Sequence, residues 1–389
     1  MIAVVLAVPL PHNNTNLMST PNLKYNKQDQ PEFIKELQKK VKDYFTTNNI
    51  SRHANLNMKL KTAFMLLLYF TPLALLLTGV VTTFWPMMLM WFIMSLGMSG
   101  IGLSIMHDAN HRSYSKNPTV NNILGFLVNF LGANDLNWKI QHNYLHHGFT
   151  NIEGIDDDIK TPVMRFSPNQ KRKKIFRFQL YYAPLLYGLM TLNWLVIKDF
   201  MSLIKYNKKN LLQRNGLTMN KAFTLLIFNK LWYLGLTLVL PLILIDLPWW
   251  QILLGFLMMQ YICGLILTLI FQPAHVIEET DFFVADESGS MENHFAIHQM
   301  KTTANFANKS VLFSWFIGGL NYQIEHHLFP NICHVHYRKI SKIVKETADE
   351  FNIPYNQHKT FFGALKSHFK LIHQLGTGKY DLKLTKVKV

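Results

Sequence analysis

The chain is organised around the hexapeptide Met106-His107-Asp108-Ala109-Asn110-His111, where a long apolar stretch ends and two histidines appear four residues apart. Residues four apart on an α-helix lie on one face with Cβ atoms about 5 to 6 Å apart, so the two imidazoles can bind one metal ion. A run of about 20 apolar residues is long enough to cross a bilayer. The stretch therefore predicts a membrane-spanning helix whose end carries two metal ligands.

Two further histidine clusters follow downstream. They read His142-Asn143-Tyr144-Leu145-His146-His147 and Gln323-Ile324-Glu325-His326-His327. His142 and His146 repeat the four-residue spacing, whereas adjacent histidines point about 100° apart around a helix and suit two different ions or opposite sides of a paired site. Gln323 lies on roughly the same face as the doublet that follows it. Seven histidines in three clusters are enough for two ions rather than one tetrahedral zinc.

The residue types alone do not select one metal. A shell of imidazoles suits iron, copper, nickel or zinc. The zinc-protease pattern H-E-x-x-H is absent, because Glu325 precedes a histidine doublet. Cys263 and Cys333 are far apart and match no ligand spacing, which argues against a disulfide framework and against a thiolate metal site.

The composition is typical of a membrane protein. Of the 389 residues, 49% are hydrophobic, and these are concentrated in a few long runs with Lys and Arg confined between them. The formal charge of +16 does not indicate a nucleic-acid partner, since no aromatic-basic module or zinc-finger spacing accompanies it. Cytoplasmic enrichment of Lys and Arg explains the charge better.

Four spans are expected, at residues 63–85, 87–106, 222–245 and 249–270. Each pair forms a hairpin whose turn, at Trp85-Pro86 or around Asp246, contains no cation, so the histidine-bearing ends are assigned to the cytoplasmic side. Lys230, inside the third span, is expected to snorkel or to face the bundle. Re-entrant segments remain the alternative to full crossings.

Two other apolar stretches are not counted as spans. Residues 120–132 are too few to cross and are expected to form an interfacial or buried connector. Residues 180–197 are read as an interfacial helix, because one more crossing would separate the third cluster from the first two. The expected fold is an all-α membrane protein with four transmembrane helices as two hairpins. Residues 107–221 and 271–389 form a cytoplasmic helical cap that holds a two-metal site.

The N-terminal region, residues 1–62, is expected to be a tail with an amphipathic helix, followed by the main domain at 63–389. Residues 1–10 are apolar without a cleavage pattern, so we expect an upstream extension with the working start near Met18; a signal peptide is the alternative. Apolar residues at helical spacing predict an amphipathic helix over residues 30–45. It lies either on the membrane surface or on the catalytic body.

Isolated histidines are usually surface residues or hydrogen-bonded core residues, and we interpret eight of them in that way: His12, His53, His294, His334, His336, His358, His368 and His373. His275 is assigned to the metal site instead, because it follows the fourth span by five residues. His298 is kept as a candidate for supporting the ligands.

At this point the sequence resembles the integral-membrane fatty acyl desaturases with three histidine boxes. The resemblance rests on HDANH at His107 to His111, on WKIQHNYLHH at Trp138 to His147 with Thr150-Asn151-Ile152 after it, and on NYQIEHHLFP beginning at Asn321. It runs from the amphipathic helix to about Tyr337. Gln323, in place of the third box's first histidine, is characteristic of the front-end branch, which introduces double bonds between an existing one and the carboxyl end.

The resemblance implies a non-haem centre of two iron ions. Its implied ligands are His107, His111, His142, His146, His147, His326 and His327, with His275 as a further ligand. Gln323 is implied as a ligand, directly or through water. Of the acidic run Asp156-Asp157-Asp158, Asp157 is chosen to orient a ligand, together with Asp108 and His298; simple solvation of the run is the alternative.

The resemblance also implies the reaction and the partners. Dioxygen is the co-substrate, and two hydrogens are removed from adjacent methylenes of a long acyl chain carried by a lipid, coenzyme A or a carrier protein. The HPGG haem motif of fused cytochrome b5 domains is missing, so electrons are expected from a separate ferredoxin or cytochrome b5. The expected location is a bacterial inner membrane. Residues 171–174 are expected to contact anionic lipid, or else an anionic head group or coenzyme A.

Two other functions stay open at this stage. A hydroxylase or ketolase on the same scaffold shares every ligand, because the first hydrogen removal is common to both reactions. A transition-metal transporter is the alternative from another class. Such proteins place their ligands near mid-membrane, whereas the clustered histidines here lie outside the spans.

Overall fold

A computed structural model describes residues 23–381. The expectations for residues 1–10 and for a start at Met18 concern residues outside this range. Four helical stretches within it are long and apolar enough to cross a membrane. They are α2 (Leu56–Leu77), α3 with α4 (Phe84–Gly100 and Met106–Asn110), α11 with α12 (Met219–Leu234 and Leu240–Leu244), and α13 (Trp249–His275). The predicted all-α membrane fold with four spans is confirmed.

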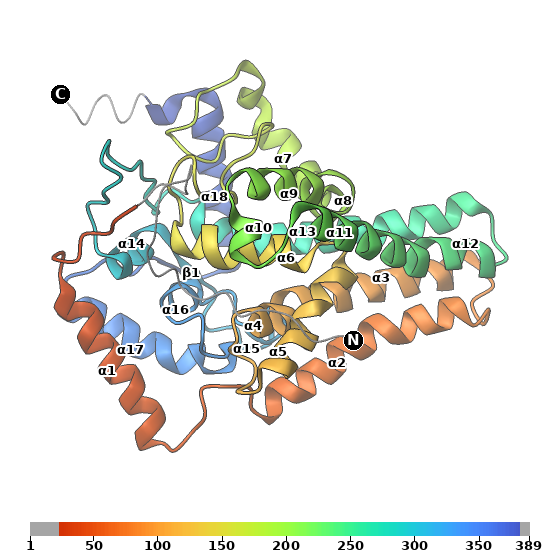
Figure 1. The fold of residues 1–389 in the computed structure, drawn as a ribbon, viewed down its shortest axis with the longest axis horizontal. Coiled ribbons are helices and arrows are strands. Elements are labelled where there is room, and N and C mark those ends of the chain that lie inside the picture. The colour runs from red at the N-terminus through yellow and green to blue at the C-terminus, as the bar shows by residue number, and fades with distance from the viewer. Residues whose placement is uncertain (1–22, 382–389) are drawn as a thin grey trace.

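The spans form two hairpins that lie side by side, with α3 packed against both α2 and α13 (Figure 1). Two of them contain a π-helical turn, at Ile101–Ile105 between α3 and α4 and at Gly235–Val239 between α11 and α12. Insertions of this kind are often found at functional sites. The first of them directly precedes His107.

The first hairpin begins and turns earlier than predicted. α2 starts at Leu56, where the Asn55 side chain accepts a hydrogen bond from the N–H of Met58 (3.1 Å), and the turn occupies residues 78–83 with Gly79 at φ 74°. Pro86 lies in the first turn of α3, where the missing N–H would have no helical partner. The proline therefore begins the second span instead of separating the two.

The remaining helices form a cap around the histidine-bearing ends of the spans (Figure 1). They are α1 (Pro31–Thr47), α5 (Pro118–Gly125), α6 (Asp135–Trp138), α7 (Gln179–Gly188), α8 (Met190–Asn193), α9 (Asp199–Lys208), α10 (Leu211–Arg214), α14 (Phe295–Thr302), α15 (Val311–Phe316), α16 (Gln323–Leu328), α17 (Tyr337–Glu350) and α18 (Phe361–Thr377). Two short strands, β1 (Asn305–Phe306) and β2 (Gln357–His358), pair in parallel and join the segment before α15 to the segment before α18.

The amphipathic helix packs on the catalytic body. α1 buries Phe33, Leu37 and Val41 against α17 and the segment that follows α16. Lys40 of α1 forms an ion pair with Glu350 of α17 (2.6 Å). Of the two places expected for residues 30–45, the structure therefore selects contact with the cap.

Residues 180–197 do not form the single interfacial helix that was expected. Helical segments Lys174–Gly188 and Met190–Lys208 meet at an angle of 69°, and the pair is apolar enough to count as a fifth span if it is one broken crossing. α7 and α8 pack along α13, whereas the chain beyond them turns so that Asp199 reaches Lys230. At the bend, the backbone of Gly188 and Met190 lies directly against Gly264 of α13, where a larger side chain would collide with it.

Lys230 faces the bundle. Its ammonium group donates to the backbone oxygens of Gly132 (2.6 Å) and Trp194 (3.1 Å) and forms an ion pair with Asp199. Residues 120–132 form a connector and not a span, ending in a 3₁₀ turn at Phe126–Leu131. Val128 and Leu131 are buried, whereas Ile123 and Phe126 are 64% and 41% exposed, so the connector combines the interfacial and buried characters that were expected as alternatives. The lysine thus fixes this connector and α9 to the third span.

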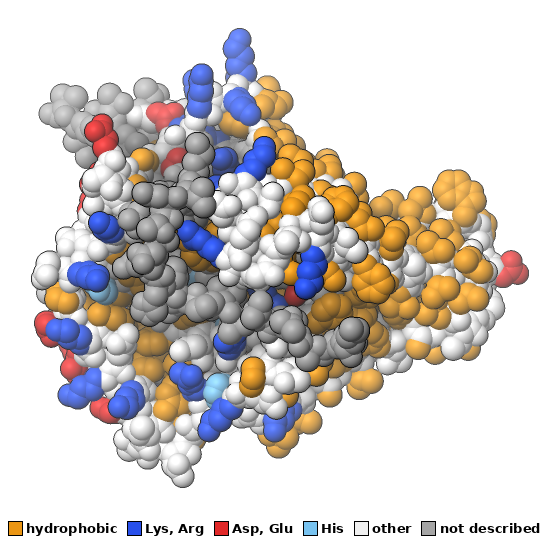
Figure 2. All heavy atoms as spheres, in the orientation of Figure 1, with side chains coloured by type: hydrophobic (Ala, Val, Ile, Leu, Met, Phe, Trp, Pro, Cys, Tyr) orange, Lys and Arg blue, Asp and Glu red, His pale blue; other side chains and the backbone are white. Residues whose placement is uncertain are grey.

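The surface reflects the same division. Figure 2 shows hydrophobic side chains over the part of the molecule that contains the spans, and Lys and Arg side chains over the cap. Leu60 and Leu67 of α2 are 62% and 63% exposed, and Leu231 of α11 is 65% exposed. Apolar side chains exposed on this scale along a span are those that contact lipid.

Candidate metal centre

Four segments bring eight histidines together where the spans meet the cap. His107 lies in α4 and His111 at its C-terminal end, while His275 is the last residue of α13. The second cluster lies in and just after a π-helix, Lys139–His146, and the third lies in α16. All eight belong to one contiguous set of ring contacts, so the histidines emerge at the same end of the bundle.

The imidazoles are packed nitrogen to nitrogen. Nε2 of His147 lies 2.9 Å from Nε2 of His326 and 3.3 Å from Nε2 of His142, which in turn lies 3.1 Å from Nε2 of His107. Two nitrogens bound to one ion at about 2.1 Å are separated by roughly 3.0 to 3.4 Å when the angle between them is 90° to 109°. The observed spacing therefore matches ligands that share a metal ion.

The ligand atoms fall into two groups. His107, His111, His142 and His326 form the first group, and His146, His275 and His327 form the second. Within each group the ligand nitrogens lie within 4.8 Å of one another. His147 lies between the two, close to His326 through its nitrogen and stacked on His327 with ring centroids 4.3 Å apart. This arrangement can hold two ions side by side.

The residues fit metal ions by a second criterion. Nε2 of His111, of His275 and of His327 is buried and has no hydrogen-bond partner within residues 23–381. A buried polar atom without a partner costs about 1 to 3 kcal/mol. A metal ion bound to these nitrogens would remove that cost.

The opposite nitrogens of the same rings are held by the protein. Nδ1 of His327 donates to Oε1 of Gln299 (2.8 Å), Nδ1 of His275 donates to the Thr302 carbonyl (3.2 Å), and Nδ1 of His326 lies 3.3 Å from the Tyr337 hydroxyl. A proton fixed on Nδ1 leaves the lone pair on Nε2. Each ring is therefore oriented with its metal-binding nitrogen toward the cluster.

Burial keeps most of these rings neutral. Removal from water, followed by repulsion between neighbouring imidazoles, holds the pKa well below its ordinary value for His142, His147, His326 and His327. Metal ions bind the neutral form of histidine. The histidines therefore do not need to lose a proton near neutral pH before a metal ion binds.

Comparisons with known proteins agree with this geometry. A family model for fatty acid desaturases matches residues 83–359, which include all eight histidines. The chain is 35% identical over 350 residues to the sn-1 linoleoyl-lipid 6-desaturase of Synechocystis sp., covering 88% of this chain and 95% of the relative. The chain belongs to the fatty acid desaturase family. It is an oxidoreductase that desaturates fatty acyl groups, as the histidine boxes predicted.

Other relatives of this desaturase have related activities in their names. It is 33% identical over 344 residues to the sn-1 linoleoyl-lipid 6-desaturase of Arthrospira platensis, covering 88% of this chain and 92% of the relative. It is 32% identical over 370 residues to the acyl-lipid (8-3)-desaturase of Physcomitrium patens, covering 92% of this chain and 75% of the relative.

The second histidine box of the desaturase is wound differently from the prediction. An α-helix would place His142 and His146 on one ion, but this segment is a π-helix, in which residues five apart are hydrogen-bonded neighbours. His142 therefore meets His147, and His146 turns toward His275 and His327, with ring centroids 4.7 and 5.0 Å away. The local winding distributes one box between the two groups.

The acidic run after this box contacts His146 through Asp156 and not through Asp157. The Asp156 carboxylate is buried and lies 3.2 Å from Nδ1 of His146, with Asp158 also within 3.5 Å. Asp157 instead forms an ion pair with Lys205 and a 3.2 Å hydrogen bond with the Tyr206 hydroxyl. The turn that follows the box directs alternate carboxylates to opposite sides. Burial alone would lower the pKa of His146, but Asp156 raises it above its ordinary value.

Substitution Asp156→Asn is expected to lower metal affinity and desaturation about 10-fold to 100-fold, because the amide cannot hold the His146 proton as the carboxylate does. The matched substitution Asp157→Asn removes a charge one residue away without touching a histidine. The metal affinity of the two variants is compared by measuring their metal content after dialysis against a series of chelator concentrations. Equal losses in the two variants would exclude an orienting role for Asp156.

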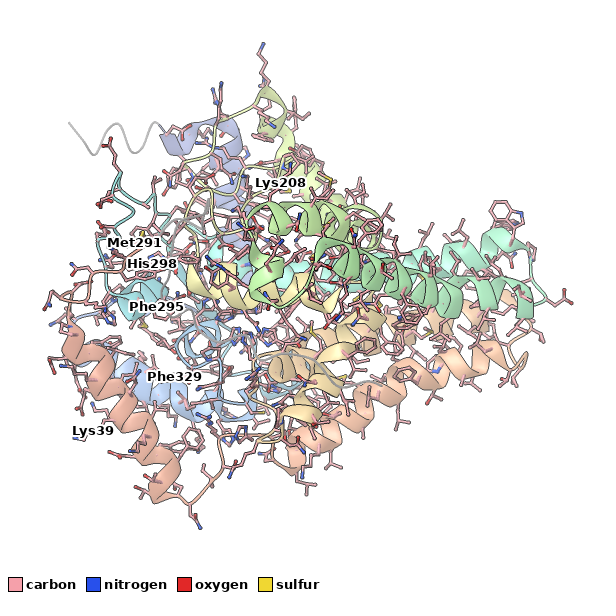
Figure 3. The ribbon with its side chains drawn as sticks, viewed as in Figure 1. Lys39, Lys208, Met291, Phe295, His298 and Phe329 are labelled. Atoms are coloured by element: carbon pink, nitrogen blue, oxygen red, sulfur yellow. The ribbon has the colours of Figure 1, made fainter. Side chains whose placement is uncertain are left out.

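The other residues predicted to support or join the metal centre, Asp108, His298 and Gln323, differ in what their side chains contact. Asp108 is adjacent to His107 in the chain, but its carboxylate is paired with Nδ1 of His334 (2.8 Å). His298, on α14 (Figure 3), donates to or accepts from no clustered histidine within the described residues; its Nε2 lies 2.7 Å from the Thr150 carbonyl. Gln323 contacts His275, and its side-chain nitrogen is buried without a partner in residues 23–381. Gln323 can therefore face a ligand site.

Several contributors were not visible in the sequence. Thr150, Gln299 and Tyr337 hold ligand rings, although only the Thr-Asn-Ile triplet that begins at Thr150 had been noticed. Of the isolated histidines, His334 and His368 are buried and hydrogen-bonded, as expected of core residues.

Gly318, at φ 65°, lets the segment before α16 approach the backbone of Leu103. This contact places the third box beside the first.

Proposed function

We propose that this protein is a front-end acyl-lipid desaturase that uses a histidine-liganded pair of iron ions. The proposal rests on the two adjacent groups of buried histidine side chains, together with Gln323 as the first residue of the third box. The names of the relatives support the front-end assignment, since they are 6-desaturases and an (8-3)-desaturase that act on acyl lipids. The unit runs from the first span to the C-terminal helix, with α1 docked on it.

One ion would be held by the first group together with His147, and the other by the second group. Gln323 lies beside His275 and would complete the ligands of the second ion, directly or through water. When bound, the pair of iron ions supplies the oxidising power of dioxygen for removing hydrogen from an unactivated methylene.

The residues of the chain supply position and exclusion of water. Hydrogen bonds that three of the rings donate to oxygens of Gln299, Thr302 and Asp156 fix the orientation of those rings in the absence of substrate. The rings of Trp138 and Phe271 lie against His142 and His107, at centroid separations of 4.5 Å for Trp138 to His142 and 6.3 Å for Phe271 to His107. These aromatic rings exclude water from the side of the histidine cluster that faces the spans, where an acyl chain would approach.

We place the protein in a bacterial inner membrane with the cap on the cytoplasmic side. The Lys and Arg side chains over the cap (Figure 2) support this orientation. Electrons would come from a separate carrier of the ferredoxin or cytochrome b5 type.

Expression in a host with a defined lipid pool, followed by mass spectrometry of the fatty acids, tests the proposal. We expect a new double bond on the carboxyl side of an existing one, with a mass loss of about 2 Da per modified chain and no added oxygen. A product that gains oxygen without a new double bond would identify a hydroxylase or ketolase. Metal flux in proteoliposomes without acyl oxidation would identify a transporter.

A further inference from the structure

A cleft of about 1040 Å³ opens beside the metal centre and has no role in the function described so far. Its walls come from α1, from the loop that leads into α2, from the segment after the first histidine box and from the segment after the third. Arg112, which follows His111 directly, and Leu328, which follows His327 directly, both line it. A group held in this cleft would lie next to two of the boxes.

The cleft carries charge of one sign. Four cations line it, namely Lys42, Arg52, Arg112 and Lys116, and no carboxylate is among the described residues that line it. None of the four forms an ion pair within residues 23–381. Arg52 and Lys116 also help burial to lower the pKa of His53, which lies on the same wall. The four cations thus line one cleft without an ion-pair partner in the described residues and can bind an anion.

The floor of the cleft is apolar. Val41 and Ile332 are buried there, and Phe329, on the side of the cap where α1 lies (Figure 3), is 8% exposed. Leu56 at the start of α2 is 70% exposed and follows Arg52 by four residues, while Ile123 of α5 is 64% exposed beyond Lys116. The cationic rim therefore lies between two elements that face lipid. A ligand with an anionic head and an apolar body can enter from the bilayer.

Arg112 has an unusual backbone. Its φ is 58°, in the left-handed region, at the position just past the C-terminus of α4 where Gly or Asn is the usual residue. A side chain larger than Gly costs about 1 kcal/mol or more in that conformation. Arg112 thus presents a guanidinium group to the cleft from a position that glycine would also adopt, and planar guanidinium groups bind phosphate through paired hydrogen bonds.

We propose that this cleft binds the phosphate of a membrane phospholipid whose acyl chain is the substrate, with Arg112 as the residue that contacts the phosphate. The inference rests on the proposed front-end function. A front-end enzyme reacts near the carboxyl end of the chain, so the head group must be held within a short distance of the metal centre. The cleft satisfies that requirement, because it borders the residues that follow His111 and His327.

The variant Arg112→Gly tests the proposal without threatening the fold, since glycine adopts a positive φ at little cost. Its apparent KM for a phosphatidylglycerol substrate, as a mole fraction in neutral detergent micelles, is expected to rise about 10-fold to 100-fold, as for the loss of one charge-assisted hydrogen bond. The KM for a galactolipid with the same acyl chains should stay unchanged. Lys345→Ala, which removes an exposed cation of α17 outside the cleft, serves as the control.

Binding of phosphatidylglycerol to the purified variant, measured by native mass spectrometry, should fall in parallel. An unchanged KM for phosphatidylglycerol, or an equal rise for the galactolipid, would overturn the proposal. If only the KM for reduced ferredoxin rises, the cleft belongs to the electron carrier. If only the KM for acyl coenzyme A rises, a membrane lipid is excluded. If the unsubstituted protein desaturates none of these substrates, the proposed function fails instead.

Discussion

The His327→Ala protein is expected to lose desaturase activity to the background of membranes that lack the enzyme, and to lose bound metal. Nε2 of His327 is buried without a partner in the described residues, while its Nδ1 is held by Gln299 at 2.8 Å. Alanine removes the donor atom from the group that includes His146 and His275, which leaves too few ligands to hold an ion there. Metal content by inductively coupled plasma mass spectrometry and product formation are measured on the same preparation.

The control is another buried histidine. Both ring nitrogens of His368 are engaged by the protein, with the Tyr187 hydroxyl at 2.6 Å and the Val276 carbonyl at 2.7 Å. His368→Gln should lower stability but leave the ratio of metal to protein unchanged. Full activity and full metal content in the His327→Ala protein would remove this residue from the ligands. Equal metal loss in both variants would indicate general unfolding.

The Lys230→Met protein is expected to be less stable by about 3 to 5 kcal/mol, since the substitution leaves the buried Asp199 carboxylate without its counter-charge. Lys230 and Asp199 are 5% and 4% exposed, and Asp199 also accepts a hydrogen bond from Asn137, the residue before Trp138. The loss should appear as a lower midpoint of thermal aggregation, measured by size-exclusion chromatography in detergent after heating.

A second substitution identifies the cause. In the Lys230→Met, Asp199→Asn double variant neither charge is left unpaired, so stability should recover part of the way toward the unsubstituted protein. Lys221, exposed in the first turn of the same helix α11, provides a matched lysine, and Lys221→Met should shift the midpoint little. A double variant that is less stable than Lys230→Met alone would show that the lysine acts through its backbone contacts and not through its charge.

Much of the architecture followed from the pattern of residues. Long apolar runs separated by basic segments predict spans, because only a helix satisfies the backbone inside a bilayer. The boundaries were less predictable: hydropathy does not register that Asn55 caps α2 or that Pro86 fits the first turn of α3. The bend between α7 and α8 escaped prediction for another reason, since it packs against Gly264 of α13, a span that comes later in the chain.

The candidate site shows the same division between local and distant causes. The three clusters and His275 were identified from residue type and from their places at the ends of apolar runs. The pairing of His142 with His147 was not, because a π-helix has the same composition as an α-helix and differs only in its hydrogen-bond register. Asp156 was likewise not separable from Asp157, since the turn after the box decides which carboxylate points inward.

The sequence by itself determined four membrane spans and three histidine boxes, because residue type and spacing determine which segments enter the bilayer and which side chains can bind metal. Its resemblance to the desaturases supplied the reaction. Only the tertiary structure decided how the eight histidines divide into two groups and which residues hold their far nitrogens. It also placed Arg112 in a cationic cleft beside those groups. These features depend on contacts between segments far apart in the chain, and the spacing of residues along a sequence does not encode such contacts.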